Sequence, residues 1–232
     1  IVHSANVSVL SVILGMRLGL DRKKLSELGF AALFHDVGKV KLPLDLITKP
    51  SQYDELDWAL MQKHPIMGVK TLVYTRDIDD YTARACLVTF EHHMHLDLSG
   101  YPRVKNPRTI NLFTRIVDIA DAYNAMTSGR AYIKNPIPPP EVLRKMVYTA
   151  GVNFDPILLK LFINIMGIYP VGSLVLLDTK ELAIVFKPNL DNPYRPRVKI
   201  IADEKGKKET MEMVDLNKID ETRGTFKRSI LR

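Results

Sequence analysis

The sequence predicts a mainly α-helical bundle followed by a small, β-rich C-terminal appendage. Apolar residues recur at helical intervals through residues 1–166. After Tyr169-Pro170 the apolar segments become short and β-branched, with turn-forming residues between them. We therefore expect two domains, a helical one over residues 1–166 and a β-rich extension with a tail over residues 167–232.

The helical part carries recognisable start and stop signals. The first expected helix covers residues 3–20 and ends near Gly19, and Asp21 is a suitable N-cap for the next helix. Gly38 fits a helix end, and Pro43 opens a short new element. Further helices are expected from Asp54, with an interruption at Pro65 just after His64, and over residues 79–93, 111–128, 141–150 and 155–166.

The C-terminal part contains segments with strand character at residues 173–178, 182–187 and 197–201. They predict a small sheet of about three strands. Because so small a sheet is marginal in isolation, we expect it to pack on the helical domain.

Composition and charge exclude several classes of protein. The single cysteine, Cys86, allows no internal disulfide framework and favours a reducing cytoplasm. No apolar stretch is long and uninterrupted enough to span a membrane as a helix. The net charge of +7 includes a basic tail, but basic and acidic residues alternate there, so we expect no nucleic-acid polymer as a partner. The chain starts at Ile1 rather than Met, and we expect an upstream sensory or receiver domain and allow for a homodimer.

One set of side chains is a candidate metal site, because imidazole and carboxylate are the ligand types that suit iron, manganese or zinc in hydrolytic sites. The set consists of His3, His35, Asp36, His64, His92, His93 and Asp121. Groups of this kind, converging from separate helices, lose too much hydration to be present for packing alone. The absence of cysteine from the set argues against a purely structural zinc site.

Two pairs of candidates are adjacent in the sequence, His35–Asp36 and His92–His93. Neighbouring helical residues project about 100° apart, so the members of a pair are not expected to face one ion side by side. Each pair can instead serve two ions about 3.5–4 Å apart, which is the spacing of a two-metal hydrolytic site. The carboxylate of Asp36 is suited to bridging such ions.

Cations and a turn near this set are candidates for binding a phosphate ester. Lys39 lies in the HDVGK segment and offers a compact positive charge. Arg130 and Lys134 follow the last candidate ligand, and arginine suits bidentate phosphate binding. The loop Gly100-Tyr101-Pro102 comes after the histidine pair, and its tyrosine either stacks on a nucleobase or packs the loop onto the domain.

The motifs, taken in their order, resemble the HD-GYP family, a branch of the HD phosphohydrolase superfamily. They are HDVGK (35–39), KHP (63–65), EHH with SGYP (91–102) and DIADAYNAMTSGRAY (118–132). The resemblance covers about residues 3–166 and implies an HD-type helical bundle that acts in bacterial signalling. The implied activity is a metal-dependent phosphodiesterase that hydrolyses cyclic di-GMP, or a related cyclic dinucleotide, to a linear dinucleotide, with further cleavage to GMP left open.

The resemblance also implies roles for the candidate residues. The histidines and aspartates of the set would hold two or three divalent transition-metal ions, above all iron or manganese. Asp36 and Lys39 would act in catalysis, with Lys39 on the phosphate. The substrate would also be bound by Gly100, Tyr101, Pro102, Arg130 and Lys134.

Some positions depart from the family pattern. Met94 stands where the family usually has glutamate, Leu98 where it has glycine, and Ile133 where it has a basic residue. These departures favour an alternative in another class, a catalytically weak HD-GYP-like module that binds a nucleotide or a protein partner and passes a signal. A hydrolase of a different phosphate ester on the same scaffold also stays open.

Overall fold

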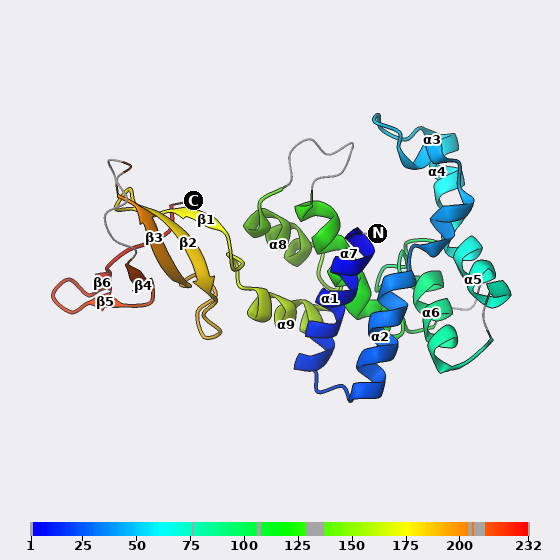
Figure 1. Ribbon diagram of the computed structural model, residues 1–232, viewed down its shortest axis with the longest axis horizontal. Helices are drawn as coiled ribbons and strands as arrows, with labels where there is room; N and C mark the ends of the chain where they lie inside the picture. The colour runs from blue at the N-terminus through cyan, green and yellow to red at the C-terminus, as the bar shows by residue number, and fades with distance from the viewer. Residues whose placement is uncertain are drawn as a thin grey trace. The chain divides into compact units, whose positions relative to one another are not determined.

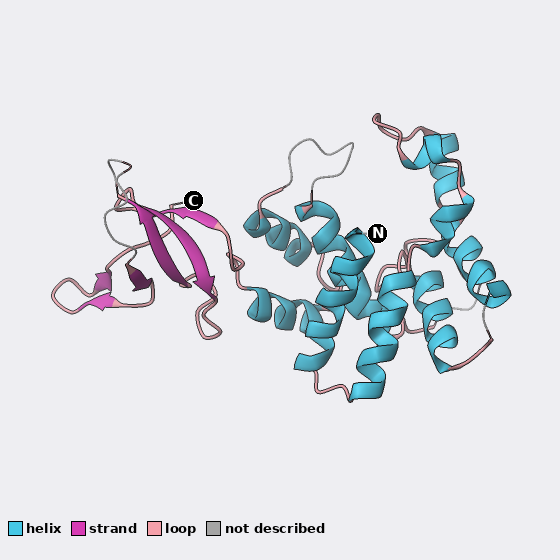
Figure 2. Ribbon diagram, viewed as in Figure 1, coloured by secondary structure: helices cyan, strands magenta, loops and turns pink. Residues whose placement is uncertain are grey.

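The computed structural model describes residues 2–75, 77–105, 108–128, 137–203, 206 and 212–231 (Figure 1). The chain divides into two compact units, Ile1–Leu161 and Phe162–Arg232. Helices make up the first unit and strands follow in the second (Figure 2), so the expected fold class is confirmed. The division of the chain falls within helix α9 (Pro156–Met166), whereas the domain boundary expected from the sequence lies at the end of that helix.

The helices of the first unit follow the expected order. They are α1 (Val2–Arg17), α2 (Arg22–Phe34), the 3₁₀ helix η1 (Val37–Lys41), α3 (Leu44–Ile47), α4 (Glu55–Met61), α5 (His64–Thr75), α6 (Asp80–Glu91), α7 (Leu112–Thr127) and α8 (Pro139–Tyr148). Helix α1 packs on α2 and α7, α2 packs on α6, and α5 packs on α6 and η1. Within the described residues, no helix is both long and apolar enough to cross a bilayer.

Side-chain caps set the first residue of several helices. Asp21 accepts a hydrogen bond from the Lys24 N–H at 2.8 Å, as its expected role requires. Asp54 and Asp57 form a reciprocal capping box at the start of α4. Caps of this kind each stabilise a helix by about 1 kcal/mol. Helices α2 and α4 therefore begin where the sequence places a carboxylate.

The expected interruption at Pro65 is wrong in its detail. Helix α4 already ends at Met61, and Pro65 lies in the first turn of the next helix, α5. In the first turn the missing N–H of proline would have no intrahelical partner in any case, so the residue favours helix initiation. His64 consequently stands at the start of α5 and not near the end of α4.

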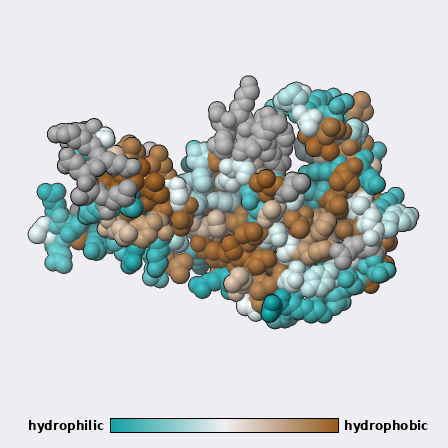
Figure 3. Space-filling view, viewed as in Figure 1, coloured by the Kyte–Doolittle hydropathy of each residue, from teal (hydrophilic) through white to brown (hydrophobic). Residues whose placement is uncertain are grey.

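Helix α1 has two apolar faces. Val7 and Leu14 are fully buried, while Val9 and Met16 are exposed. Apolar residues gather over the region of α1 in the space-filling view (Figure 3). Of the candidate ligands, α1 carries His3, whose Nε2 lies 2.9 Å from Oδ1 of Asp121 on α7 (Leu112–Thr127).

The second unit is built on an antiparallel sheet in the order β1-β2-β3-β4. Its strands are β1 (Leu174–Leu176), β2 (Leu182–Lys187), β3 (Arg197–Ala202) and β4 (Met213–Asp215), and a separate two-stranded sheet joins β5 (Ile219–Asp220) to β6 (Thr225–Phe226). The sequence missed β4 to β6 because two or three residues are too few to show an alternating pattern.

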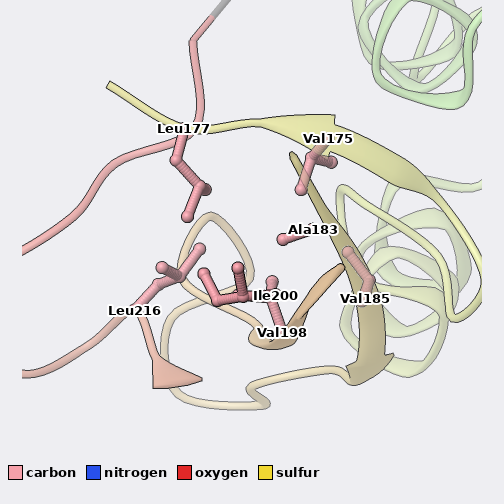
Figure 4. Packing of buried hydrophobic residues seen from close by; sticks show 7 residues of the cluster. All are labelled: Val175, Leu177, Ala183, Val185, Val198, Ile200 and Leu216. Atoms are coloured by element: carbon pink, nitrogen blue, oxygen red, sulfur yellow. The ribbon is translucent and has the colours of Figure 1, made fainter. Parts of the chain in front are cut away.

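One face of this sheet has its own apolar core (Figure 4). The core consists of Val175, Leu177, Ala183, Val185, Val198, Ile200 and Leu216. Tyr169, Val214 and Ile230 pack against it. A core of this kind gives the unit cohesion beyond its strand pairing; the expected packing on the helical domain stays a prediction.

Candidate metal centre

Three of the candidate histidines are oriented in the same way. The Nδ1 atoms of His35, His64 and His92 lie 2.7, 2.7 and 2.9 Å from the carbonyl oxygens of Ala32, Met61 and Thr89, each three residues earlier. A carbonyl oxygen only accepts, so each Nδ1 donates its proton to the backbone. The Nε2 atom on the other side of each ring is then left to bind another group. All three side chains are fully buried. Metal-binding histidines are commonly oriented by an outer hydrogen bond of this kind.

The ligand atoms fall into two groups that share one residue. The α5–α6 group consists of Asp36, His64, His92 and His93, and the α1–α2 group consists of His3, His35 and Asp36. Within each group the ligand atoms lie within 4.8 Å of one another. Asp36 belongs to both groups, which is the position of a carboxylate able to bridge two ions.

The expectation that each adjacent pair serves two ions agrees with the geometry of one pair only. Asp36 belongs to both groups while His35 belongs to one, but His92 and His93 belong to the same group. Helix α6 ends at Glu91, with His92 as its C-cap, and α2 ends at Phe34, with His35 as its C-cap. The 100° spacing of a continuous helix therefore does not apply at these positions.

The arrangement fits divalent metal ions. The Nε2 atoms of His64 and His92 lie 3.2 Å apart. Because a neutral imidazole carries one proton, and in both rings Nδ1 carries it, each Nε2 presents a lone pair to the other. Among the described residues, buried Nε2 of His35 and Oδ1 of Asp36 have no hydrogen-bond partner. Buried acceptors that face one another repel unless a cation lies between them. The nitrogen and oxygen donors suit iron, manganese or zinc.

Two buried side chains of the centre, Asp36 and His35, have strongly shifted pKa values. Burial opposes ionisation of Asp36, but the positive charges of His35 and Lys39 outweigh it and lower the pKa of this carboxyl well below its usual range. Burial opposes the charged form of His35, yet Asp36 and Asp121 raise its pKa to about 9. Burial and the neighbouring His92 lower the pKa of His64 to about 4. Asp36 therefore stays ionised and His64 stays neutral, as metal ligation needs, whereas His35 would release its proton when an ion binds.

Helix α7 supplies the remaining candidate, Asp121. Its Oδ1 lies 2.9 Å from Nε2 of His3 and 3.9 Å from Nε2 of His35. The Nδ1 atom of His3 donates to Oδ1 of Asn124 at 2.8 Å, one turn after Asp121 on the same helix. Nδ2 of Asn124 in turn donates to Oγ of Ser128 at 3.0 Å, which sets the orientation of the amide.

Sequence reasoning missed Asn124 and a second carboxyl, Asp118. Asp118 precedes Asp121 by one turn of α7, and burial together with the Asp121 carboxylate raises the pKa of Asp118 well above its usual value. The available signal was the helical spacing of Asp118, Asp121 and Asn124, which places them on one side of α7. A single sequence does not show that this side faces the histidines.

Close backbone contacts bring η1 to the start of α5. A Cβ atom on Gly38 would lie 1.9 Å from the carbonyl oxygen of His64 and 2.5 Å from the backbone nitrogen of Gly68. Only glycine allows the two backbones to approach this closely. The glycine of HDVGK therefore holds Asp36 beside His64, with Oδ1 of Asp36 3.4 Å from Nε2 of His64.

Of the expected phosphate-binding cations, Lys39 lies at the centre. Its Nζ donates to Oδ2 of Asp36 at 2.6 Å, and its side chain is mostly buried. It is thus neither a solvated surface lysine nor remote from the ligands. Arg130 and Lys134 lie outside the described residues, as does Ile133.

The loop that contains Gly100-Tyr101-Pro102 folds back onto His93. The Tyr101 ring stacks on the His93 ring with centroids 4.6 Å apart and 31° between the planes, and the Tyr101 N–H donates to the His93 carbonyl at 3.0 Å. A Cβ on Gly100 would lie 1.9 Å from that same carbonyl oxygen. Burial raises the pKa of the Tyr101 hydroxyl, which stays neutral. Of the two roles expected for Tyr101, these contacts support packing of the loop onto a ligand.

Comparisons with known proteins identify the family of the chain. Residues 2–158 match the model of an HD domain family. The chain belongs to this HD domain family. Residues 174–222 match a KOW domain that is associated with HD domains, and these residues cover the main sheet.

Curated relatives extend over much of the chain. The cyclic di-GMP phosphodiesterase PA4108 of Pseudomonas aeruginosa is 32% identical over 95% of this chain and 52% of its own length. The cyclic di-GMP phosphodiesterase PdeB of Borreliella burgdorferi is 28% identical over 87% of this chain and 52% of its own length. A 3'3'-cGAMP-specific phosphodiesterase of Vibrio cholerae is 31% identical over 70% of this chain and 30% of its own length. The chain thus spans about half the length, or less, of these relatives.

Solved structures share the fold. Bd1817, an HDG"Y"P protein from Bdellovibrio bacteriovorus, has a TM-score of 0.55 at 24% identity and covers 70% of this chain and 51% of its own. A cyclic GMP-AMP phosphodiesterase of Vibrio cholerae has a TM-score of 0.51 at 21% identity and covers 70% of this chain and 43% of its own. The expected resemblance to HD-GYP proteins is confirmed at the level of the family and its helical fold.

The structure describes the backbone conformation or burial of two residues that depart from the HD-GYP pattern, Leu98 and Met94. Leu98 has a φ of 66°, in the left-handed region that glycine adopts freely. A residue with a Cβ atom is strained there by about 1–2 kcal/mol. Met94 is only 3% exposed, so it fills part of the core where the family pattern has a charged side chain.

Proposed function

We propose that this HD domain is a metal-dependent phosphodiesterase that hydrolyses cyclic di-GMP, or a related cyclic dinucleotide, to a linear dinucleotide. The observation that carries the proposal is the pair of ligand groups that share Asp36, in which buried Nε2 of His35 and Oδ1 of Asp36 have no hydrogen-bond partner. Relatives that match most of the chain are named as phosphodiesterases of cyclic di-GMP and of 3'3'-cGAMP.

The ligand set would hold two or three divalent ions, and we propose iron or manganese. The proposed ligands are His3, His35, Asp36, His64, His92, His93 and Asp121. Such ions supply Lewis-acid polarisation of phosphoryl oxygens and activation of water. The chain's own contribution is to fix the imidazole orientations through backbone carbonyls and to keep Asp36 ionised.

Lys39 is proposed to act on the substrate phosphate. Its ammonium already lies beside Asp36, so a short movement of a flexible side chain would bring it to a phosphoryl oxygen. Charge that develops on those oxygens in the transition state would be stabilised by this cation. We propose further substrate contacts from Gly100, Tyr101 and Pro102 and, from outside the described residues, Arg130 and Lys134.

The direct test is cleavage by purified protein loaded with Mn²⁺ or Fe²⁺. Cyclic di-GMP and 3'3'-cGAMP would be incubated in parallel, with products separated by chromatography. We expect metal-dependent formation of a linear dinucleotide that is abolished in Asp36→Ala and retained in Asp45→Ala, a control at an exposed aspartate on α3. Absence of cleavage of either nucleotide by fully metal-loaded protein would refute the proposal.

A catalytically weak binding module is the second candidate, favoured by the strained conformation of Leu98 in the loop that follows the histidine pair. Such a module would bind intact cyclic dinucleotide tightly without consuming it, and Asp36→Ala would leave the affinity largely unchanged. Calorimetry with metal-loaded protein separates the two, because an enzyme must stabilise the transition state more than the bound substrate. A cytoplasmic location, a homodimer and an upstream sensory or receiver domain are further proposals.

A further inference from the structure

A buried glutamate, Glu91, lies immediately before the histidine pair. It is the last residue of α6 and is only 1% exposed. A buried carboxylate costs several kcal/mol of lost hydration unless donors surround it. The hydrogen-bond donors around the Glu91 carboxylate therefore indicate which parts of the structure it connects.

Both carboxylate oxygens of Glu91 are bound, and the donors come from another part of the chain. Oε2 accepts from the Thr114 hydroxyl at 2.8 Å and from the Asn111 N–H at 3.2 Å. Oε1 pairs with the Arg108 guanidinium at 2.7 Å. Asn111 is the N-cap of α7 and Thr114 is fully buried in its first turn, so the negative charge also lies at the favourable end of the helix dipole.

This carboxylate joins the two elements that carry opposite sides of the candidate centre. On one side, Glu91 is adjacent to His92 and His93 of the α5–α6 group. On the other, Thr114 precedes Asp121 by about two helical turns on α7, and Asp121 pairs with His3 of the α1–α2 group. The distance between the two groups therefore depends on how the end of α6 is held against the start of α7.

We propose that Glu91 is a positioning residue for the metal centre, which holds the His92–His93 end of α6 against the first turn of α7 and so sets the spacing of the two ligand groups. This inference rests on the proposed function only in taking the centre to bind metal. It predicts that loss of the Glu91 contacts changes metal affinity, although Glu91 is not itself in either ligand group.

The test compares Glu91→Gln and Thr114→Val with a matched control. Thr114→Val keeps the shape of the side chain and removes one donor to Glu91. Glu27→Gln is the control, because Glu27 is also a buried glutamate with two basic neighbours, Lys23 and Arg84, but belongs to neither ligand group and is not adjacent to a member in the sequence. Mn²⁺ affinity would be measured by calorimetry, with thermal unfolding and the kinetics of cyclic di-GMP cleavage measured on the same samples.

We expect Glu91→Gln and Thr114→Val to weaken Mn²⁺ binding by about 10–100-fold, the usual cost of losing an outer contact of a metal site. The kcat should fall while KM for the nucleotide stays near the wild-type value, because Glu91 does not touch the substrate. Glu27→Gln should lower the unfolding midpoint and leave Mn²⁺ affinity within about two-fold of wild type, well below that cost.

The inference would be overturned by wild-type Mn²⁺ affinity in folded Glu91→Gln, or by an equal loss of affinity in Glu27→Gln. If Glu91→Gln does not fold, Thr114→Val and Arg108→Ala decide, since the Arg108 side chain is half-exposed and its removal leaves the core intact. Mn²⁺ binding that responds to Glu91 in a protein without phosphodiesterase activity would refute the proposed function and leave the positioning role in place.

Discussion

The two ligand groups of the candidate centre differ in how one histidine is oriented. In the α5–α6 group, His64 and His92 donate to backbone carbonyls and are fully buried. In the α1–α2 group, His35 is held in the same way. His3, however, donates to the side-chain amide of Asn124, and the His3 side chain is 25% exposed. A backbone acceptor is present whatever side chain its residue carries, whereas a side-chain acceptor is lost in one substitution. The α5–α6 group should therefore be the more robust half of the centre.

The largest expected effect comes from Asp36, the residue that the two groups share. Asp36→Ala should remove metal from both groups and lower turnover by more than about 100-fold, beyond the usual effect of an outer contact. His3→Ala should remove metal from the α1–α2 group alone. Elemental analysis after metal loading measures both, with His95→Ala as the control because His95 belongs to neither group. Equal metal loss in Asp36→Ala and His3→Ala would contradict the division into two groups.

Lys39 should have the next largest effect, and on turnover only. Lys39→Ala removes the cation beside Asp36 without removing a ligand. We expect unchanged metal content and a fall in kcat of about 10²–10³-fold, as for the loss of one preorganised group that stabilises transition-state charge. Elemental analysis and steady-state kinetics on the same preparation distinguish this outcome from loss of metal. Reduced metal content would show that Lys39 instead supports the ligand geometry.

Asn124 tests the difference in orientation directly. Asn124→Ala leaves His3 without its acceptor and should weaken metal binding by the α1–α2 group about 10–100-fold. Ser128→Ala removes only the contact that orients the Asn124 amide, so its effect should be smaller. Calorimetric titration with Mn²⁺ should show one weakened and one unchanged class of site. Two equally weakened classes would mean that the groups are not independent.

The sequence could predict the ligands more readily than their arrangement. His35, His64 and His92 stand in short motifs at helix ends, and the caps at Asp21 and Asp54 depend on residues within one turn, so local reasoning reached them. The grouping of His92 with His93 depends on α6 ending at Glu91, and helix ends are uncertain by one or two residues from sequence.

Contacts between segments far apart in the sequence could not be predicted, for a different reason. Asn124 is 121 residues from His3, and Glu91 is 23 residues from Thr114. Their roles follow from the packing of α1 and α6 on α7, which no periodicity in one helix specifies. The order of helices and the change to strands were predictable because both follow from local apolar spacing.

Restoring the family glutamate should destabilise this protein. Met94 is 3% exposed, so Met94→Glu would bury a carboxylate in a site shaped for an apolar side chain. The expected loss is about 3 kcal/mol in the free energy of unfolding, within the range for an unpaired buried charge. Urea unfolding measures it, with Met94→Leu as a control that conserves volume and should cost less than about 1.5 kcal/mol. A stable Met94→Glu variant would mean that a cation of the centre compensates the new charge.

The smallest effect concerns Leu98, and it separates strain in the site from strain elsewhere. Leu98 and Lys180 both have a left-handed backbone, with φ of 66° and 63°, but Lys180 lies in the turn between β1 and β2. Replacement by glycine relieves about 1–2 kcal/mol of strain at each, partly offset by the greater freedom of glycine in the unfolded chain.

We therefore expect Leu98→Gly and Lys180→Gly each to raise the free energy of unfolding by up to about 1 kcal/mol. Only Leu98→Gly should also change phosphodiesterase activity, because its loop folds back through Tyr101 onto the candidate ligand His93. Urea unfolding and steady-state kinetics of the two variants give four values to compare. A loss of activity in Leu98→Gly without loss of stability would show that the strained leucine holds the loop in its working position, whereas a gain would show that the strain limits the enzyme.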